Sequence, residues 1–166
     1  MEPVTSGSSV REYREDPLEE KALVDLLRAA MAAPSAGDER PWQFLVIRSP
    51  SVRKQLAEML PEAHMVSHAP VAILPCGDTS RQKHVGFWVT DCAAATQTIL
   101  IEAERMGLGA IWLGIYPIKG RVRRIRDFLN IPQHIVPFAL VAVGHPAESR
   151  DPHDRFDPSR VHLETW

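Results

Sequence analysis

The spacing of hydrophobic and polar residues predicts helices and strands that alternate along the chain. Apolar side chains recur at helical spacing in segments that we expect to be helices over residues 19–31, 50–60, 85–106 and 121–129. Short apolar runs bounded by Pro, Gly and polar residues predict strands over residues 42–47, 70–75, 108–113 and 137–144. Strands that alternate with helices indicate a layered α/β domain.

The faces of the two most regular helices are also predicted. The first helix places apolar residues on one side, which are Ala22, Leu23, Leu26, Leu27, Ala30 and Met31. The helix over 85–106 carries small residues, which are Ala93, Ala94, Ala95, Thr98 and Ala103, and it ends at Gly107, a favourable C-cap. Small side chains allow another backbone to approach closely, so this helix is a candidate interface.

The tail that begins at His145 has almost no periodicity and contains three prolines. We expect it to be extended. Because it ends in Trp166, we also expect it to pack against another surface.

Composition limits the class of protein. The chain has 166 residues, of which 45% are hydrophobic and 24% charged, and this suits one globular domain over residues 1–166. Its net charge of −2 gives no attraction to nucleic acid or to an anionic membrane. No apolar run approaches the ~18 residues that span a bilayer, and the first residues do not resemble a signal peptide. Cys76 and Cys92 form no Cys-x-x-Cys pair, so we expect a reducing, cytoplasmic location.

Several chemistries are poorly supported by the motifs. Gly107-x-Gly109 lacks the third glycine of a dinucleotide-binding fingerprint. His64 and His68 have i,i+4 spacing but no third ligand, so no metal site is expected. The arginines over 121–126 are typical of a solvated helix face. Cys76 has no histidine nearby in sequence, and no serine lies in a Gly-x-Ser-x-Gly motif.

The turn between the first helix and the first strand is the most informative segment. It reads Pro34-Ser-Ala-Gly37, followed by Asp38-Glu-Arg40 and Pro41-Trp42. Small residues leave room for a large planar ligand to lie against the backbone, and the prolines stiffen both ends of the turn.

This turn resembles the Ala-Pro-Ser-Ala-Gly-Asn-x-Gln-Pro-Trp signature of the FMN-dependent nitroreductase family. Three other blocks resemble the family in the same order, which are Ser9-Val-Arg-Glu-Tyr13, Asp91–Gln97 with Gly107–Pro117, and Gly144–Glu148 with Arg155–His162. The Gly114-Ile-Tyr-Pro117 segment is similar to short bacterial members. The order and spacing of the blocks carry the resemblance, because single blocks are weak.

The resemblance implies a fold and an assembly. The fold would be a layered α+β domain in which helices flank a central, mostly antiparallel mixed sheet. The protein would form an intertwined homodimer with two FMN sites at the interface. The long helix over 85–106 would supply much of that interface.

The resemblance also implies flavin contacts. Arg11 would lie at the flavin N1/C2=O edge and stabilise the charge of reduced flavin. Ser8, Ser9 and Arg155 would hold the phosphate. The residues Pro34, Ser35, Ala36 and Asp38 would line the flavin from the partner subunit, and backbone groups of Leu113, Gly114 and Ile115 would reach the isoalloxazine ring. These residues also have structural interpretations. Ser9 could be an N-cap, and Arg11 or Arg155 a surface cation. The segment from Pro34 to Ala36 could be an ordinary loop, and the segment from Leu113 to Ile115 a strand end with a turn glycine.

Two departures from the family pattern bear on flavin affinity. Gly7 and Ser8 stand where the family has arginines, so a phosphate contact is lost, although Ser8, Ser9 and the Gly7 amide could form a neutral nest. Asp38 replaces an asparagine, and its carboxylate would disfavour reduced flavin. Arg40 could neutralise the charge of that carboxylate.

The resulting prediction is an FMN-dependent NAD(P)H oxidoreductase that reduces nitroaromatics, quinones or similar electron-poor molecules by ping-pong hydride transfer. It needs no acid–base catalytic residue. Phe87, Trp88 and Tyr116 are candidates for substrate-pocket walls, with core packing as the alternative. The alternative function is a flavin-binding or interaction protein with weakened FMN affinity and no reductase activity.

Overall fold

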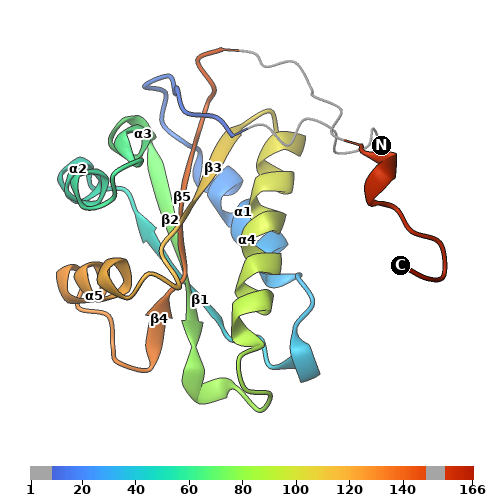
Figure 1. Cartoon of the computed structure of the whole chain (residues 1–166). Helices are drawn as coiled ribbons and strands as arrows, with labels where there is room; N and C mark the ends of the chain where they lie inside the picture. The colour runs from blue at the N-terminus through green and yellow to red at the C-terminus, as the bar shows by residue number, and fades with distance from the viewer. Residues whose placement is uncertain (1–8, 149–155) are drawn as a thin grey trace.

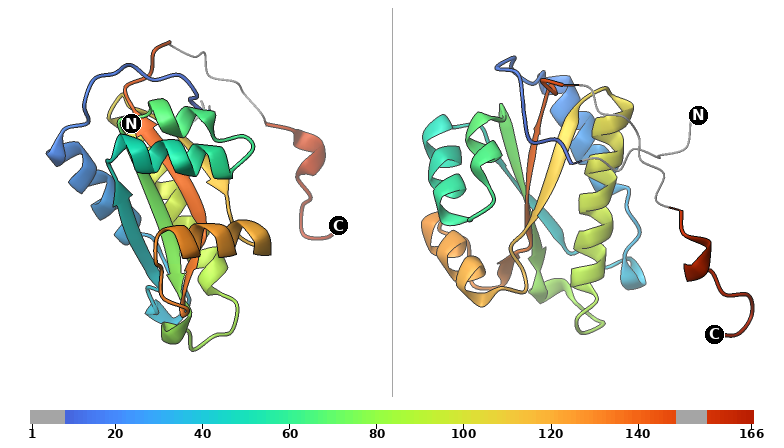
Figure 2. Two further views of the ribbon diagram at one scale, coloured as in Figure 1. Left: turned by 90° about the vertical axis from the view of Figure 1, so that its left-hand side faces the viewer. Right: turned by 45° about the horizontal axis from the view of Figure 1, so that its top comes forward.

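A central sheet with helices on both faces organises the molecule (Figure 1). The structure is a computed structural model, and it describes residues 9–148 and 156–166. Helices α1 (Glu20–Met31) and α4 (Trp88–Arg105) cover one face of the sheet. Helices α2 (Pro50–Met59), α3 (His64–His68) and α5 (Lys119–Phe128) cover the other face (Figure 2).

The sheet is antiparallel at every strand pair within the described residues. The strand order is β1 (Trp42–Ile47), β2 (Val71–Asp78), β5 (Ala139–Gly144) and β3 (Gly109–Gly114). A fifth strand, β4 (Ile135–Pro137), pairs with the C-terminal end of β2. The register places Leu45 opposite Leu74 and Ile111 opposite Ala142. The predicted layered fold with a mainly antiparallel central sheet is confirmed.

Strand burial explains why the central strands are continuous apolar runs rather than alternating patterns. All eight residues of β2 and all six of β5 are buried. On β2, Val71 and Ile73 pack into the core beneath α1 and α4, while Ala72 and Leu74 pack into the core beneath α2, α3 and α5. A strand that is covered on both faces is apolar along most of its length. Asp78, at the end of β2, is the exception, and its carboxylate accepts hydrogen bonds from the N–H and hydroxyl of Ser80.

The predicted helices agree with the structure to within a few residues. Gly107 ends α4 with a φ of 72°, as expected of a C-cap glycine. Helix α3 and strand β4 were not predicted, because five and three residues are too few for periodicity to emerge. Met31, expected on the buried face of α1, is 54% exposed because it lies in the last turn, beyond the buried Leu26 and Ala30.

Some of the small residues of α4 pack into the core of this chain. Ala95 and Ala103 are completely buried beneath the sheet, whereas Ala93, Ala94 and Thr98 are half-buried. The outward face of the helix contains Gln97 and Ile101. None of the helices in the described ranges combines the length and apolar character needed to cross a membrane.

The C-terminal segment over 156–166 is drawn apart from the sheet and its helices (Figures 1 and 2). It contains a short 3-10 turn, η3 (Pro158–Arg160), and exposes Phe156, Leu163 and Trp166. The Trp166 ring stacks on His162 with centroids 4.2 Å apart and is otherwise fully exposed. Trp166 does not pack against the sheet or helices of its own chain, and the expectation that the tail packs against another surface stays a prediction.

One glycine of β2 is required for close packing between the sheet and α4. A Cβ atom on Gly77 would lie 2.2 Å from Cε3 of Trp88, the first residue of α4. Trp88 is buried, so its indole ring has little room to move aside. The indole therefore occupies the space that a side chain at position 77 would need.

We expect Gly77→Ala to lower the free energy of unfolding by roughly 1–3 kcal/mol, because the methyl group overpacks the contact with Trp88. Gly120→Ala is the matched control. A Cβ at position 120 meets nothing within 4 Å, and Ala is the better helix former. Urea unfolding followed by circular dichroism measures both variants. Equal midpoints for Gly77→Ala and the wild type would contradict this account of the packing.

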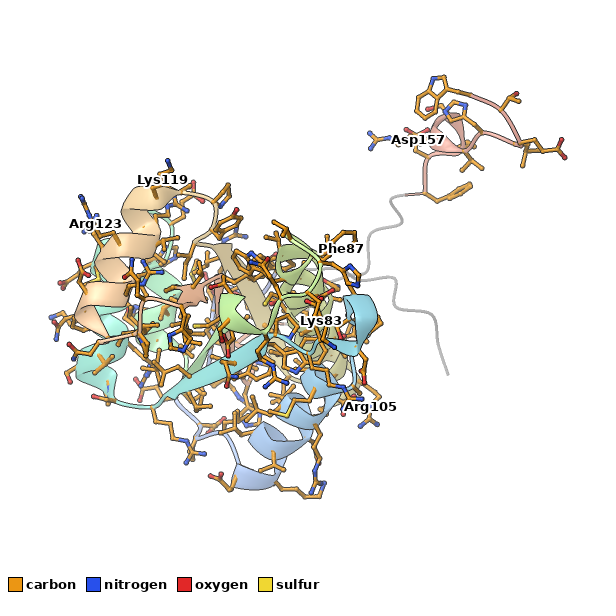
Figure 3. The ribbon with its side chains drawn as sticks, turned by 90° about the horizontal axis from the view of Figure 1, so that it is seen from below. Lys83, Phe87, Arg105, Lys119, Arg123 and Asp157 are labelled. Atoms are coloured by element: carbon orange, nitrogen blue, oxygen red, sulfur yellow. The ribbon has the colours of Figure 1, made fainter. Side chains whose placement is uncertain are left out.

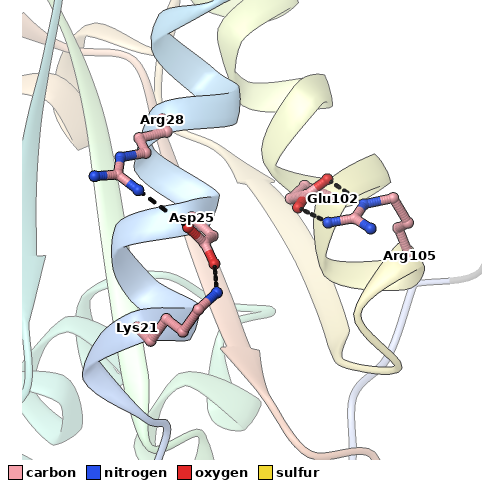
Figure 4. A network of polar contacts seen from close by, with 5 residues as sticks. All are labelled: Lys21, Asp25, Arg28, Glu102 and Arg105. Atoms are coloured by element: carbon pink, nitrogen blue, oxygen red, sulfur yellow. Dashed lines mark hydrogen bonds and ion pairs between the residues drawn. The ribbon is translucent and has the colours of Figure 1, made fainter.

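Charged side chains form ion pairs within α1 and within α4, two helices that lie in contact (Figure 4). On α1, Asp25 pairs with Lys21 at 2.5 Å and with Arg28 at 3.5 Å. On α4, Glu102 pairs with Arg105 at 2.6 Å. The Lys21 hydrogen bond lowers the pKa of Asp25, with a further contribution from Arg105 across the helix pair. The Arg105 hydrogen bond likewise lowers the pKa of Glu102.

These lowered pKa values predict a pH dependence. The ion pairs of Asp25 and Glu102 stabilise the folded state fully above the pKa values that the two carboxyls have in the unfolded chain. This stabilisation is lost as the pH falls through their lower pKa values in the folded state. The double variant Asp25→Asn, Glu102→Gln should therefore be less stable than the wild type near neutral pH. The difference in unfolding free energy should shrink below about pH 4 and also in about 1 M salt. If the difference in unfolding free energy between the two proteins is independent of pH and salt, the charges of Asp25 and Glu102 are not its cause.

Candidate functional site

One small hollow brings together four of the residues expected to contact flavin. It has a volume of about 130 Å³, and it lies at the free edge of the sheet, beside β3. Its lining includes Ser9 and Arg11 from the N-terminal segment and Leu113 and Gly114 from the end of β3. The other lining residues are Leu60, Glu62, Ile111, Trp112 and Arg121.

The N-terminal segment reaches this hollow because it is attached to the edge of the sheet. The Val10 N–H donates to the Ala110 carbonyl at 3.1 Å. The Val10 side chain occupies the space where a Cβ on Gly109 would lie, at 2.6 Å from that position. The Tyr13 hydroxyl donates to the carbonyls of Val10 and Ala142, at 2.9 and 3.1 Å. These contacts place Ser9 and Arg11 beside β3.

The end of β3 leaves backbone accessible at Gly114. A Cβ at this position would meet nothing within 4 Å, so there is open space above the backbone. The Gly114 carbonyl accepts a hydrogen bond from Arg121 Nη1 at 2.8 Å. The N–H groups of Ile115 and Tyr116 both donate to the Phe138 carbonyl, and Ile115 is completely buried. The accessible backbone of the expected flavin segment is therefore at Gly114, and Leu113 beside it also lines the hollow.

The small-residue turn lies outside this hollow. Pro34, Ser35 and Ala36 are not among its lining residues, and the turn is held against α4 by the Ala36 N–H, which donates to Asp91 Oδ1 at 3.1 Å. The short helix η1 (Ala36–Asp38) follows, with Gly37 at a φ of 55°. Within one chain the two halves of the expected flavin site are thus separate.

The charged half of the turn is internally neutralised. Asp38 and Arg40 form a two-point contact, with Nε to Oδ1 at 2.7 Å and Nη2 to Oδ2 at 3.0 Å. Both residues have positive φ values, 55° and 46°, and the Arg40 N–H donates to Ser35 Oγ at 3.0 Å. The neutralisation of Asp38 by Arg40, anticipated from the sequence, is present. Ser8, Gly7 and Arg155, the other residues expected near the phosphate, lie outside the described residues.

The aromatic candidates for pocket walls differ in exposure. Trp88 is buried and packs edge-on against Tyr116, with ring centroids 4.8 Å apart, and against Phe138 at 6.3 Å. Tyr116 and Phe87 are 36% and 53% exposed. Trp88 is therefore a core residue, the alternative left open by the sequence, while Tyr116 and Phe87 present aromatic surface to solvent. Trp112 lines the hollow itself, a role that its position in an apolar strand does not reveal.

Cysteine and metal chemistry find little support. Both cysteines are free and buried. Burial raises the pKa of Cys76 to about 12 and raises the pKa of Cys92 as well, so neither is a thiolate near neutral pH. Across residues 9–148 and 156–166, no group of three or more His, Cys, Asp or Glu side chains is arranged to hold a metal ion.

The arginines of α5 divide between two surfaces. Arg121 turns toward the hollow at Gly114. Lys119 and Arg123 are exposed and point away from the body of the molecule (Figure 3). Together with Arg126 they border a separate open depression of about 520 Å³. The exposed side chains agree with the predicted solvated helix face.

The chain resembles known proteins over nearly its whole length. A model described as the nitroreductase family matches residues 5–64 and 59–145. A protein of Methanothermobacter thermautotrophicus, named "Putative NADH dehydrogenase/NAD(P)H nitroreductase", is 45% identical over 100% of this chain and 87% of its own length. An "NADH dehydrogenase" of Thermus thermophilus is 32% identical over 93% of this chain and 90% of its own length.

The fold is shared as well. A crystal structure of a Parabacteroides distasonis protein, which bears the same name as the Methanothermobacter protein, is 37% identical. It covers 98% of this chain and 96% of its own, with a TM-score of 0.94. The matched family model, the identities and the shared fold agree with the order of the four sequence blocks, and the chain belongs to the nitroreductase family.

Proposed function

We propose that the protein is an FMN-dependent NAD(P)H oxidoreductase that reduces nitroaromatics, quinones or similar electron-poor small molecules. The observation that carries the proposal is the meeting of Ser9 and Arg11 with Leu113 and the accessible backbone of Gly114 in one hollow. Family membership and the names of relatives support it, among them an "FMN reductase [NAD(P)H]" of Bacillus subtilis that is 23% identical.

The residues of the hollow suit a flavin mononucleotide. The Ser9 hydroxyl and the Arg11 guanidinium are donors for anionic or carbonyl oxygens, and the open backbone at Gly114 can accept a flat ring. When bound, FMN supplies the hydride-accepting and electron-donating chemistry that no side chain of this chain provides. Arg11 contributes positive charge to stabilise the reduced form, and Arg121 fixes the Gly114 carbonyl so that the backbone keeps its position.

Completion of the site requires a second copy of the chain. Small-ligand sites enclose about 300–1,000 Å³, whereas this hollow has about 130 Å³, so one chain lines only part of a flavin site. The small-residue turn of a second protomer would supply the missing wall. The exposed apolar side chains also favour a homodimer, since Phe87, Ile101 and Ile118 and the tail residues Phe156, Leu163 and Trp166 otherwise face solvent. Two buried free cysteines support a reducing, cytoplasmic location.

The alternative, a flavin-binding or interaction protein without reductase activity, rests on the charged turn and on Gly7 and Ser8. The contact between Asp38 and Arg40 weakens the first reason, because the carboxylate charge is compensated locally. The remaining reason lies outside the described residues.

Purification gives a direct test. We expect a yellow protein that keeps FMN through gel filtration and is bleached by NADH or NADPH without oxygen, because the hollow and the turn of a second protomer would enclose the ring. The visible absorbance of the flavin reports both its oxidised and its reduced state. A colourless protein that does not retain added FMN would contradict the proposal and support the alternative.

Arg11 has a separate test. Replacement by alanine in Arg11→Ala should lower the reduction potential of bound FMN and slow its reduction, because the cation that stabilises reduced flavin is removed. Arg14→Ala serves as the control. Arg14 is also exposed, lies three residues away, pairs with Asp16 at 2.7 Å and does not line the hollow. If potentiometric titration gives the same potential for Arg11→Ala and the wild type, Arg11 does not act on the flavin.

A further inference from the structure

Two buried carboxylates hold the small-residue turn in place. Asp91 is 5% exposed and lies in the first turn of α4, while Glu39 is 4% exposed and belongs to the turn itself. Buried carboxylates are costly unless hydrogen bonds compensate them, so the partners of these two groups indicate what they do.

Asp91 binds the backbone at the centre of the turn. Its Oδ1 accepts the Ala36 N–H at 3.1 Å, and its Oδ2 is buried with no hydrogen-bond partner in the described structure. The N-terminal turn of a helix favours a negative charge, so α4 stabilises the carboxylate at this position. The Asp91 side chain thereby ties the turn to the helix.

Glu39 ties the same turn to the segment before α4. Its Oε1 accepts the N–H groups of Lys83 and His84, both at 2.7 Å. The Glu39 carbonyl accepts Arg81 Nε at 3.3 Å. Ala36 and Glu39 are thus fixed on opposite sides of Gly37 and Asp38.

The conformation between these anchors requires external support. Gly37 and Asp38 both have a φ of 55°, a left-handed conformation that is uncommon for residues other than glycine. Local conformations of this kind persist when surrounding contacts determine them. The anchors from Asp91 and Glu39 provide such contacts.

The first turn of α4 supports both halves of the expected flavin site. Asp91 holds the turn around Ala36, and Trp88, one helical turn earlier, packs against Tyr116 in the segment that follows Gly114. Asp91 acts on the turn and Trp88 acts on the strand end, so one short stretch of helix positions two separate surfaces.

We propose that Asp91 is a positioning residue of the flavin site. It holds the Ala36 amide so that Pro34, Ser35 and Ala36 present a fixed surface to the FMN of the partner protomer, and Glu39 secures the other end of the turn. This inference rests on the proposed function, which assigns that surface to the flavin.

The test compares Asp91→Ala with Asp91→Asn in the full-length protein. Alanine removes the acceptor, whereas the asparagine carbonyl can still accept the Ala36 N–H. We expect Asp91→Ala to weaken FMN binding roughly tenfold or more and Asp91→Asn to stay within about threefold of the wild type. Quenching of flavin fluorescence measures the dissociation constant. Hydrogen exchange of the Ala36 amide, followed by NMR, should accelerate in Asp91→Ala and remain slow in Asp91→Asn.

The control is Glu102→Ala, which removes another carboxylate from α4 but one that pairs with Arg105 rather than with the turn. It should leave FMN binding unchanged. If Asp91→Ala does not fold, Asp91→Ser replaces it, because the hydroxyl is polar but too short to reach Ala36.

Three results would overturn the inference. FMN binding could be unchanged in Asp91→Ala, it could be equally weakened in Asp91→Asn and Asp91→Ala, or Ala36 exchange could be insensitive to residue 91. In each case the wild type would still bind FMN and be reduced by NAD(P)H, and the proposed function would stand. A wild type that binds no FMN would overturn both.

Discussion

The contact between the first turn of α4 and strand β2 supports two of the segments assigned to the site, the small-residue turn and the segment after β3. Gly77 has no side chain, so the Trp88 indole lies directly on the strand and brings the start of α4 close to the sheet. From this location Asp91 reaches the Ala36 amide and Trp88 reaches Tyr116. A bulkier residue at position 77 would displace the helix turn, and both segments would lose their support together.

The other constraint is that the sheet is covered on both faces. The buried strands β2 and β5 hold β3 at the edge, and the N-terminal segment then lies against that edge with Val10 over Gly109. An edge strand has free backbone groups on its outer side. The proposed flavin site uses this free edge, where Ser9, Arg11, Leu113 and the accessible backbone of Gly114 line one hollow.

The sequence was sufficient to predict the elements whose hydrophobic periodicity is strong. It was insufficient to predict features that depend on contacts between residues distant in the sequence. The amphipathic pattern predicted α1, and the continuous apolar run predicted β2, because burial alone determines both. The short α3 and β4 have no periodicity to detect. The site residues on β3 and near Arg11 were identified by motif order. The role of Asp91 was not predicted, because 55 residues separate it from Ala36 and a lone aspartate in a helix gives no signal of its partner.

The electrostatic effect of Asp38 and Arg40 depends on their contact in the structure and not only on their presence in the sequence. As separate residues, Asp38 would repel reduced flavin and Arg40 would attract it. The structure joins them in a two-point contact on a backbone where both have positive φ, so their net effect on a nearby ligand is small. The same contact, with the Arg40 N–H on Ser35 Oγ, makes these residues part of the support of the turn. The small residues remain free to meet a flat ligand, while the charged residues, together with Asp91 and Glu39, keep them in position.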